Sequence, residues 1–302
     1  MPIRLGVLPE SPPRAAAARP PTPAGDPTAQ PKELRVPKPV TFEPGESIKL
    51  AGVDPRQIDG EWDKATAAER IAENTARSRE LAYRLYAENR RALLLVLQGM
   101  DTAGKDGTIR VVTTGINPQT FHITSFKQPS ITELDHDFLW RIHKRVPGRG
   151  QIGIFNRSQY EDVLIVRVHN LVPEEEWRGR YKRINEFEEM LTEGRVNLVK
   201  CFLHISYEEQ RERLQARLDK PHKRWKFSRG DLAERRLWPD YQQAYEDALR
   251  KCNTPHAPWH IIPSDRKWYR NLVVSELLRD TLEAMDPQFP PCEEGLDGIV
   301  VE

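Results

Sequence analysis

Residues Gly99 to Gly107 read Gly-Met-Asp-Thr-Ala-Gly-Lys-Asp-Gly, and they closely follow the apolar run Ala92 to Leu97. A short apolar run of this kind is typical of a parallel strand buried on both faces. The spacing Gly99-x-x-x-x-Gly104-Lys105 is that of a Walker A loop, and the preceding strand is the context that the motif needs. Glycines let backbone N–H groups turn toward phosphate oxygens, and the next helix offers its positive N-terminal end. The stretch therefore predicts a phosphate-binding loop.

Two carboxylates distinguish this loop. Serine or threonine normally follows the lysine and holds magnesium, but here the position is Asp106, and Asp101 also lies within the loop. Carboxylates repel phosphates unless a cation intervenes, so the pair predicts Mg²⁺ bridging protein and substrate. The alternatives are that Asp106 caps the helix and that the stretch is a tight turn with a surface lysine. The residues expected to contact phosphate here are Gly99, Ala103, Gly104, Lys105, Asp106 and Gly107.

Strand and helix patterns alternate along the chain. Residues 62–91 carry apolar side chains at helical spacing, with a weak middle where Asn74 and Ser78 stand on the apolar face. Strands are expected at residues 92–97, 121–126, 152–155, 196–206 and 259–263. Helices are expected between them, with start signals at Ser130, Pro173 and Ser206. The alternation predicts an α/β fold, a parallel sheet with helices on both faces and a ligand at the carboxyl ends of its strands.

The first 45 residues differ in composition from the rest. Residues 1–45 hold about half of the 25 prolines, a density that predicts a disordered arm. Residues 46–290 are then the catalytic domain, and residues 291–302 are a tail. The net charge of +1 gives no general attraction to nucleic acid, and no apolar run near the motif approaches the ~20 residues of a membrane span. The three cysteines include no CxxC pair, so we expect a reduced, cytoplasmic protein.

A second group of polar residues follows the expected strand 152–155. This strand is placed like a Walker B strand, which usually ends in aspartate, but Asn156 stands there, with Arg157 and Glu161 close behind. An arginine at a strand end could neutralise phosphoryl charge, whereas the plainer interpretation is a salt-bridged strand terminus. Phe126, Lys127 and Pro129 follow another expected strand and could wall an adenine pocket, although Phe126 could equally be ordinary core.

A third group is basic. Between Lys220 and Arg236 the chain carries seven lysines and arginines against Asp231 and Glu234, with aromatic residues interleaved. A charge run is usually a solvated face. Because the whole chain is nearly neutral, this clustering instead favours a lid that closes over a substrate with many phosphates.

Taken in order, these motifs resemble those of polyphosphate kinases of the type 2 family, from about Ile48 to Leu282. The matching stretches are Leu97 to Gly107, Asn117 to Gln119, Ser125 to Pro129, Leu134 to His143, Phe155 to Leu164, and Lys223 to Phe227 with Asp231 to Arg235. The resemblance implies a three-layer α/β/α P-loop kinase-like fold with a helical lid at about 207–240. It also implies Mg²⁺-dependent, reversible phosphoryl transfer between inorganic polyphosphate and a nucleotide.

The resemblance also suggests site residues and partners. Asp101, Lys105, Arg157, Arg224 and Lys226 are expected to be catalytic; Lys223, Arg224 and Arg235 are expected to hold phosphates. The nucleotide is expected at Asn117, Phe126, Lys127, Pro129, Asn156 and Glu161, and the metal at Asp101 and Asp106. Asn156 with Glu161 is similar to the subgroup that phosphorylates both AMP and ADP, with guanine nucleotides as a second option. A homo-oligomer of two or four chains is expected, without nucleic acid or membrane.

Two rival functions remain open from the residues themselves. An ATP-using kinase would need the same loop, but only a few cations in its lid. A polyanion-binding module could use the cations and aromatic residues of 220–238, with steep salt dependence and no need for Mg²⁺.

Overall fold

Five parallel strands form the centre of the fold, in the order β2-β3-β1-β4-β5. The computed structural model describes residues 35–296 and 299–301. The strands are β1 (Ala92–Gln98), β2 (Phe121–Ser125), β3 (Ile152–Asn156), β4 (Val196–His204) and β5 (Trp259–Pro263). Every residue of β1 is buried, as its apolar run predicts, because it pairs with β3 on one side and β4 on the other.

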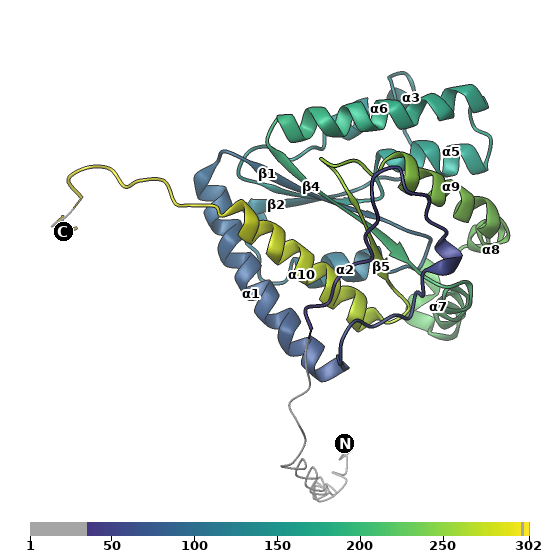
Figure 1. The fold of residues 1–302 in the computed structure, drawn as a ribbon, viewed down its shortest axis with the longest axis horizontal. Helices are drawn as coiled ribbons and strands as arrows, with labels where there is room; N and C mark the ends of the chain where they lie inside the picture. The colour runs from purple at the N-terminus through teal and green to yellow at the C-terminus, as the bar shows by residue number, and fades with distance from the viewer. Residues whose placement is uncertain (1–34, 297–298, 302) are drawn as a thin grey trace, which may run out of the picture. The chain divides into compact units, whose positions relative to one another are not determined.

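Helices cover both faces of this sheet (Figure 1). One layer holds α1 (Lys64–Glu88), α2 (Lys105–Val112) and α10 (Lys267–Met285), and the other holds α5 (Ile165–Val168), α6 (Glu174–Glu193) and α9 (Trp238–Lys251). Leu95 of β1 belongs to the core cluster that contains Leu81 of α1 and Leu272 of α10. Its neighbour Val96 belongs to a second cluster with Phe187 of α6. The expected three-layer α/β/α fold is confirmed.

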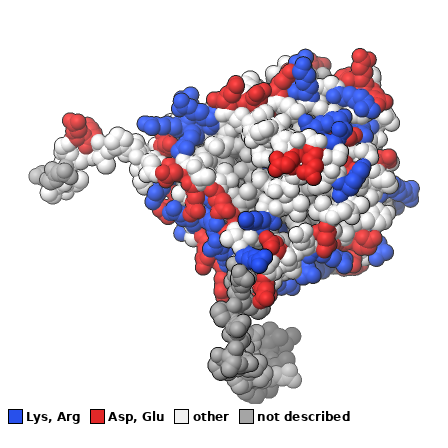
Figure 2. All heavy atoms as spheres, in the orientation of Figure 1, with Lys and Arg blue, Asp and Glu red and all other residues white. Residues whose placement is uncertain are grey.

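Shorter elements connect the strands and helices of these layers. They are η1 (Leu50–Gly52), η2 (Pro118–Thr120), α3 (Ile131–Leu134), α4 (Trp140–His143), η3 (Gln159–Val163), α7 (Tyr207–Asp219), η4 (Pro221–Lys226) and α8 (Arg229–Arg236). The expected lid region, residues 207–240, is thus α7, η4, α8 and the first residues of α9. On the face drawn in Figure 2, acidic and basic side chains are mixed, in keeping with the near-neutral chain.

The weak middle of the first helix has a structural reason. Asn74 is fully buried, and its Nδ2 donates to Oε2 of Glu276 on α10 at 2.6 Å. Arg70 donates to the other oxygen of Glu276 at 2.7 Å. The contact between α1 and α10 therefore has a polar centre, which an apolar periodicity cannot indicate.

The expected disordered arm needs a correction at its end. Residues 1–34 lie outside the described residues, but residues 35–45 are described and lie along the sheet. Val40 and Ile261 of β5 exchange backbone hydrogen bonds of 2.9 Å, and the carbonyl of Arg35 accepts from Nε1 of Trp62 at 2.8 Å. Proline is tolerated in such an edge segment. Because Arg35 and Val40 make these contacts, the folded chain begins before residue 46.

Candidate active site

The glycine loop (residues 99–104) connects β1 to α2 at the carboxyl end of the central strand. Gly99 and Gly104 have φ angles of 149° and 110°, which favour glycine. Lys105 is buried, and its Nζ donates to the carbonyls of Gly99 at 2.6 Å and Met100 at 3.3 Å. Burial, with the neighbouring charge of Arg157, lowers the pKa of Lys105 to about 8. The loop thus holds a cation ready for an anionic ligand.

Two buried arginines contact this loop, and neither was predicted from a sequence motif. Arg270 of α10 donates from NH1 to the carbonyl of Ala103 at 2.9 Å. Arg213 of α7 donates to the carbonyls of Thr102 at 2.9 Å and Ala103 at 3.2 Å. Burial and the nearby Arg213 lower the pKa of Arg270 to about 9. The two guanidiniums therefore hold the carbonyls of Thr102 and Ala103 pointing away from the turn.

An ion pair joins the loop to the end of β3. Arg157, at a left-handed φ of 65°, donates from NH2 to Oδ1 of Asp101 at 2.7 Å, and its NH1 lies 3.6 Å from Oε2 of Glu161. Burial opposes ionisation of Asp101, but Lys105 and Arg157 outweigh it and hold its pKa below the usual range. Burial raises the pKa of Glu161 in spite of the same two cations. Four charges of alternating sign therefore meet beside the loop.

A cavity of about 470 Å³ opens in front of these groups, and we call it the loop cavity. It brings together eight of the site residues that were predicted from the sequence: Asp101, Gly104, Lys105, Asp106, Phe126, Lys127, Asn156 and Arg157. Nδ2 of Asn156 donates to Oδ1 of Asp106 at 2.7 Å, so the amide holds a carboxylate. Glu161 lines an adjoining cavity of about 150 Å³ with Asp101 and Arg157.

The carboxylates of the loop cavity fit a magnesium ion that arrives with phosphate. Asp101 and Asp106 both line the cavity, and each uses Oδ1 in the bonds described above. Residues 35–296 and 299–301 contain no group of three or more His, Cys, Asp or Glu side chains that could hold a metal. Magnesium commonly binds through one or two carboxylates and completes its shell with phosphate oxygens and water.

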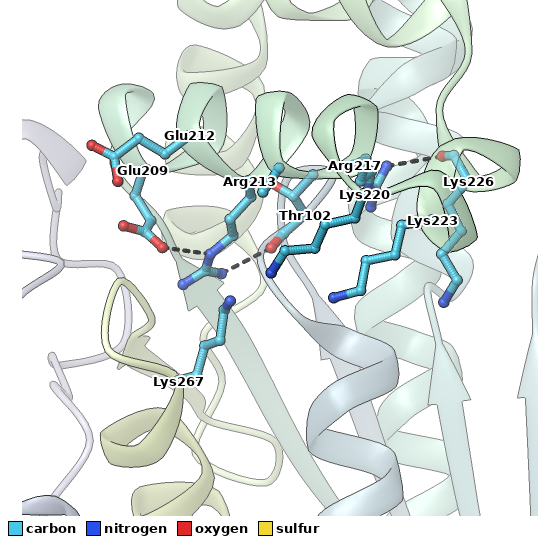
Figure 3. Close-up of a pocket in the computed structure, with 10 residues that line it drawn as sticks. Thr102, Glu209, Glu212, Arg213, Arg217, Lys220, Lys223, Lys226 and Lys267 are labelled. Atoms are coloured by element: carbon cyan, nitrogen blue, oxygen red, sulfur yellow. Dashed lines mark hydrogen bonds and ion pairs between the residues drawn. The ribbon is translucent and has the colours of Figure 1, made fainter.

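A second cavity of about 390 Å³, which we call the lysine cavity, lies between α7, η4 and the start of α10 (Figure 3). In Figure 3 the side chains of Lys220, Lys223 and Lys267 extend toward one space, beside Arg213. Lys226 lines the same cavity. Thr102 and Arg217 line both this cavity and the loop cavity. The two cavities therefore adjoin at these two residues.

Several expected site residues are placed elsewhere. Arg224 lines neither cavity, because its Nε donates back to the carbonyl of Leu218 at 2.7 Å. Arg235 donates to the carbonyl of Tyr207 at 2.7 Å, and its guanidinium stacks 3.3 Å from the centre of the Tyr207 ring. Arginines in a basic run can turn toward the backbone. Lys220, the first cation of the expected basic stretch, lines the lysine cavity with Arg217 and Lys267, which were not predicted.

The expected adenine pocket is only partly assembled. Phe126 is buried against Phe155, with ring centres 4.9 Å apart, although it also lines the loop cavity. Pro129 lines a different cavity of about 710 Å³. Asn117 precedes β2 and therefore lies at the amino end of a parallel strand, away from the loop, where it accepts from the N–H of Gln119 at 3.0 Å.

Two of the expected loop contacts are also used within the protein. The N–H of Ala103 donates to the carbonyl of Met100 at 3.1 Å, so it is not directed at a ligand. Gly107 lies in the first turn of α2, next to the guanidinium of Arg270.

No helix of the described residues is long and apolar enough to cross a bilayer.

Comparison with known proteins now identifies the family. The family described as Polyphosphate kinase 2 (PPK2) matches residues 61–290. The chain belongs to the polyphosphate kinase 2 family. An AMP/ADP-polyphosphate phosphotransferase of Meiothermus ruber is 49% identical over 261 residues, covering 86% of this chain and 98% of that protein. An ADP-polyphosphate phosphotransferase of Rhodopseudomonas palustris is 45% identical, covering 82% of this chain and 89% of that protein.

A solved structure supports the same assignment. Polyphosphate kinase 2 from Arthrobacter aurescens TC1 superposes with a TM-score of 0.80 at 44% identity, covering 85% of this chain and 96% of that chain. The resemblance drawn from the motifs and the expected P-loop kinase-like fold are both confirmed.

Proposed function

We propose that this enzyme moves the terminal phosphoryl group of inorganic polyphosphate to AMP and to ADP, reversibly and with Mg²⁺. The names of the two similar phosphotransferases support this substrate pair. Because both AMP and ADP stand in the name of the relative with 49% identity, we assign both acceptors to this chain.

The observation that carries the proposal is the junction of the two cavities. The loop cavity offers the glycine loop, Lys105 and Arg157, which suit the phosphates that exchange the phosphoryl group. The lysine cavity adds Lys220, Lys223, Lys226 and Lys267 beyond Thr102 and Arg217. A nucleoside triphosphate ends at its γ-phosphate, whereas a polymeric donor continues and needs further cations. We therefore place the polyphosphate chain across both cavities.

The residues provide positioning and charge compensation, which account for most of the catalysis of phosphoryl transfer. Lys105 and the N-terminal end of α2 would hold the phosphates at the junction of donor and acceptor. Arg157 would stabilise charge on the transferred group. The acceptor is a phosphate that is already anionic near neutral pH, so no strong general base is required.

Asp101 and Asp106 would hold Mg²⁺ in the loop cavity. When bound, the ion would neutralise charge on the phosphates and draw donor and acceptor together. Asn156 would keep Asp106 oriented through the 2.7 Å hydrogen bond. Residues 207–240 would act as the lid, with α7 as its fixed side, because Arg213 ties α7 to the glycine loop. The resemblance also favours an assembly of two or four chains, which sedimentation would test.

A comparison of donors tests the proposal. Purified enzyme receives AMP with either polyphosphate or ATP at matched phosphoryl concentration. We expect polyphosphate to be the better donor by at least tenfold in kcat/KM. A clear preference for ATP would show that the enzyme is an ordinary nucleotide kinase.

A further inference from the structure

A buried polar network lies directly behind the segment that carries Arg157 and Glu161. Its members are Lys200 of β4, Glu188 of α6 and Tyr160 of η3, and each is fully buried. Nζ of Lys200 donates to Oε2 of Glu188 at 2.7 Å, to the hydroxyl of Tyr160 at 2.9 Å and to the carbonyl of Cys252 at 2.6 Å. The hydroxyl of Tyr160 donates to Oε1 of Glu188 at 2.7 Å.

A second hydrogen bond attaches the same segment to the same carboxylate. Nε2 of Gln159 donates to Oε1 of Glu188 at 2.9 Å. Glu188 therefore accepts from two consecutive residues of η3, and Lys200 compensates its charge. Burial, with the charge of Glu188, raises the pKa of Tyr160 well above its usual value, so the hydroxyl keeps its proton.

The segment held in this way, η3, begins at Gln159, two residues after Arg157. Arg157 has a left-handed φ of 65°, a conformation that a residue with a side chain rarely adopts and that its surroundings must maintain. Its N–H donates to the carbonyl of Leu97 at 3.0 Å. From the other side, the amide of Gln98, in the orientation that satisfies both of its ends, donates to Oε1 of Glu161 at 3.1 Å and accepts from the N–H of Ser158 at 3.0 Å.

An isolated ion pair in a dry core is a poor source of stability, because desolvation offsets most of its attraction. A directional hydrogen-bonded network instead fixes geometry. We propose that Lys200, Glu188 and Tyr160 are positioning residues that hold Arg157 and Glu161 in place for phosphoryl transfer. This inference rests on the role proposed above for Arg157.

A double-mutant cycle tests the coupling. Tyr160→Phe removes one hydroxyl and keeps the ring and the buried ion pair. We expect it to lower kcat about tenfold, with KM for polyphosphate changed less than twofold, because the binding cations are untouched. We expect Arg157→Lys to lower kcat by itself. If Tyr160 acts through Arg157, adding Y160F to R157K causes little further loss.

Tyr181→Phe is the matched control. Tyr181 is another buried tyrosine, on α6, whose hydroxyl accepts from Arg167 of α5 at 3.4 Å instead. The kcat of Y181F should stay within twofold of the wild-type value. Thermal unfolding of Y160F and Y181F is measured alongside the kinetics. Should Y160F unfold, Gln159→Met, which removes the other bond to Glu188, enters the same cycle.

The outcomes separate this inference from the proposed function. Wild-type enzyme without polyphosphate-dependent activity would refute the function. If the wild-type enzyme is active, two results would overturn the positioning network alone. One is an unchanged kcat in the network variant. The other is that the network variant and R157K lower kcat independently.

Discussion

Arg157 donates from NH2 to Oδ1 of Asp101 at 2.7 Å, and this ion pair links the end of β3 to the glycine loop. Both side chains are about one-third exposed, and both line the loop cavity. A phosphate that enters the cavity therefore meets a cation already placed by a carboxylate. A metal ion bound by that carboxylate would free the arginine for the phosphate.

The first prediction concerns the loop lysine. Lys105→Met should lower kcat at least a thousandfold, because the variant removes the buried cation nearest the phosphates. The protein should remain folded and no less stable, since burial already disfavours the charge of Lys105. Steady-state kinetics and thermal unfolding check both parts, and near-normal turnover would contradict the assigned role.

The second prediction follows from the pKa of Lys105, which is lowered from 10.5 to about 8. Phosphate binding needs the protonated form, which is lost in the free enzyme as the pH rises through about 8. We therefore expect kcat/KM for polyphosphate to fall above this pH, because kcat/KM reports the free enzyme. Bound phosphates favour the charged lysine, so the decline in kcat should lie at higher pH. A flat kcat/KM profile up to pH 10 would contradict this prediction.

The third prediction concerns backbone fit at Gly104. Gly104→Ala places a Cβ 1.8 Å from NH1 of Arg270 at a φ of 110°, so the loop or the arginine must move. We expect a loss of roughly 2–4 kcal/mol of stability and most of the activity. The control is Gly179→Ala in the exposed middle of α6, where nothing lies within 4 Å. That variant should gain roughly 0.5–1 kcal/mol, because alanine favours the helix. Equal changes in the free energy of unfolding for the two variants would contradict the close packing of Arg270 against Gly104.

Fold and site differ in how far the sequence could predict them. The strands and the glycine loop are local patterns, so β1 and Lys105 were located correctly. Arg213 and Arg270 could not be predicted from a local pattern, because they are 110 and 167 residues away from Ala103 in the chain. Arg224 lies outside both cavities because it donates to the carbonyl of Leu218, and a basic run does not show which cations turn back to the backbone. Asn117 lies at the amino end of β2, and its motif gives no information on which end of the sheet it occupies.

The fourth prediction tests the polyphosphate track. Lys267→Gln and Lys220→Gln should each raise KM for long polyphosphate about five- to tenfold, the range expected for one charge-assisted contact. KM for the nucleotide and for tripolyphosphate should change less than twofold, because the proposal places these ligands in the loop cavity. Lys64→Gln, at the exposed start of α1, is the control and should change none of these constants. Equal effects of K267Q on short and long donors would contradict the track.

The fifth prediction concerns the metal. Asp101→Asn should raise the Mg²⁺ concentration for half-maximal activity at least tenfold, because an amide is a weaker ligand than a carboxylate. Chelation should abolish wild-type activity, and added Mg²⁺ should restore it. An unchanged Mg²⁺ dependence in the variant would place the metal elsewhere.

The central claim is tested most directly by product formation. Wild-type enzyme and K105M are each given polyphosphate and Mg²⁺ with AMP alone or ADP alone, and the nucleotides are separated and quantified over time. The account predicts ADP and then ATP from AMP, ATP from ADP, and no product with K105M. The absence of product from both acceptors with the folded wild-type enzyme would contradict it.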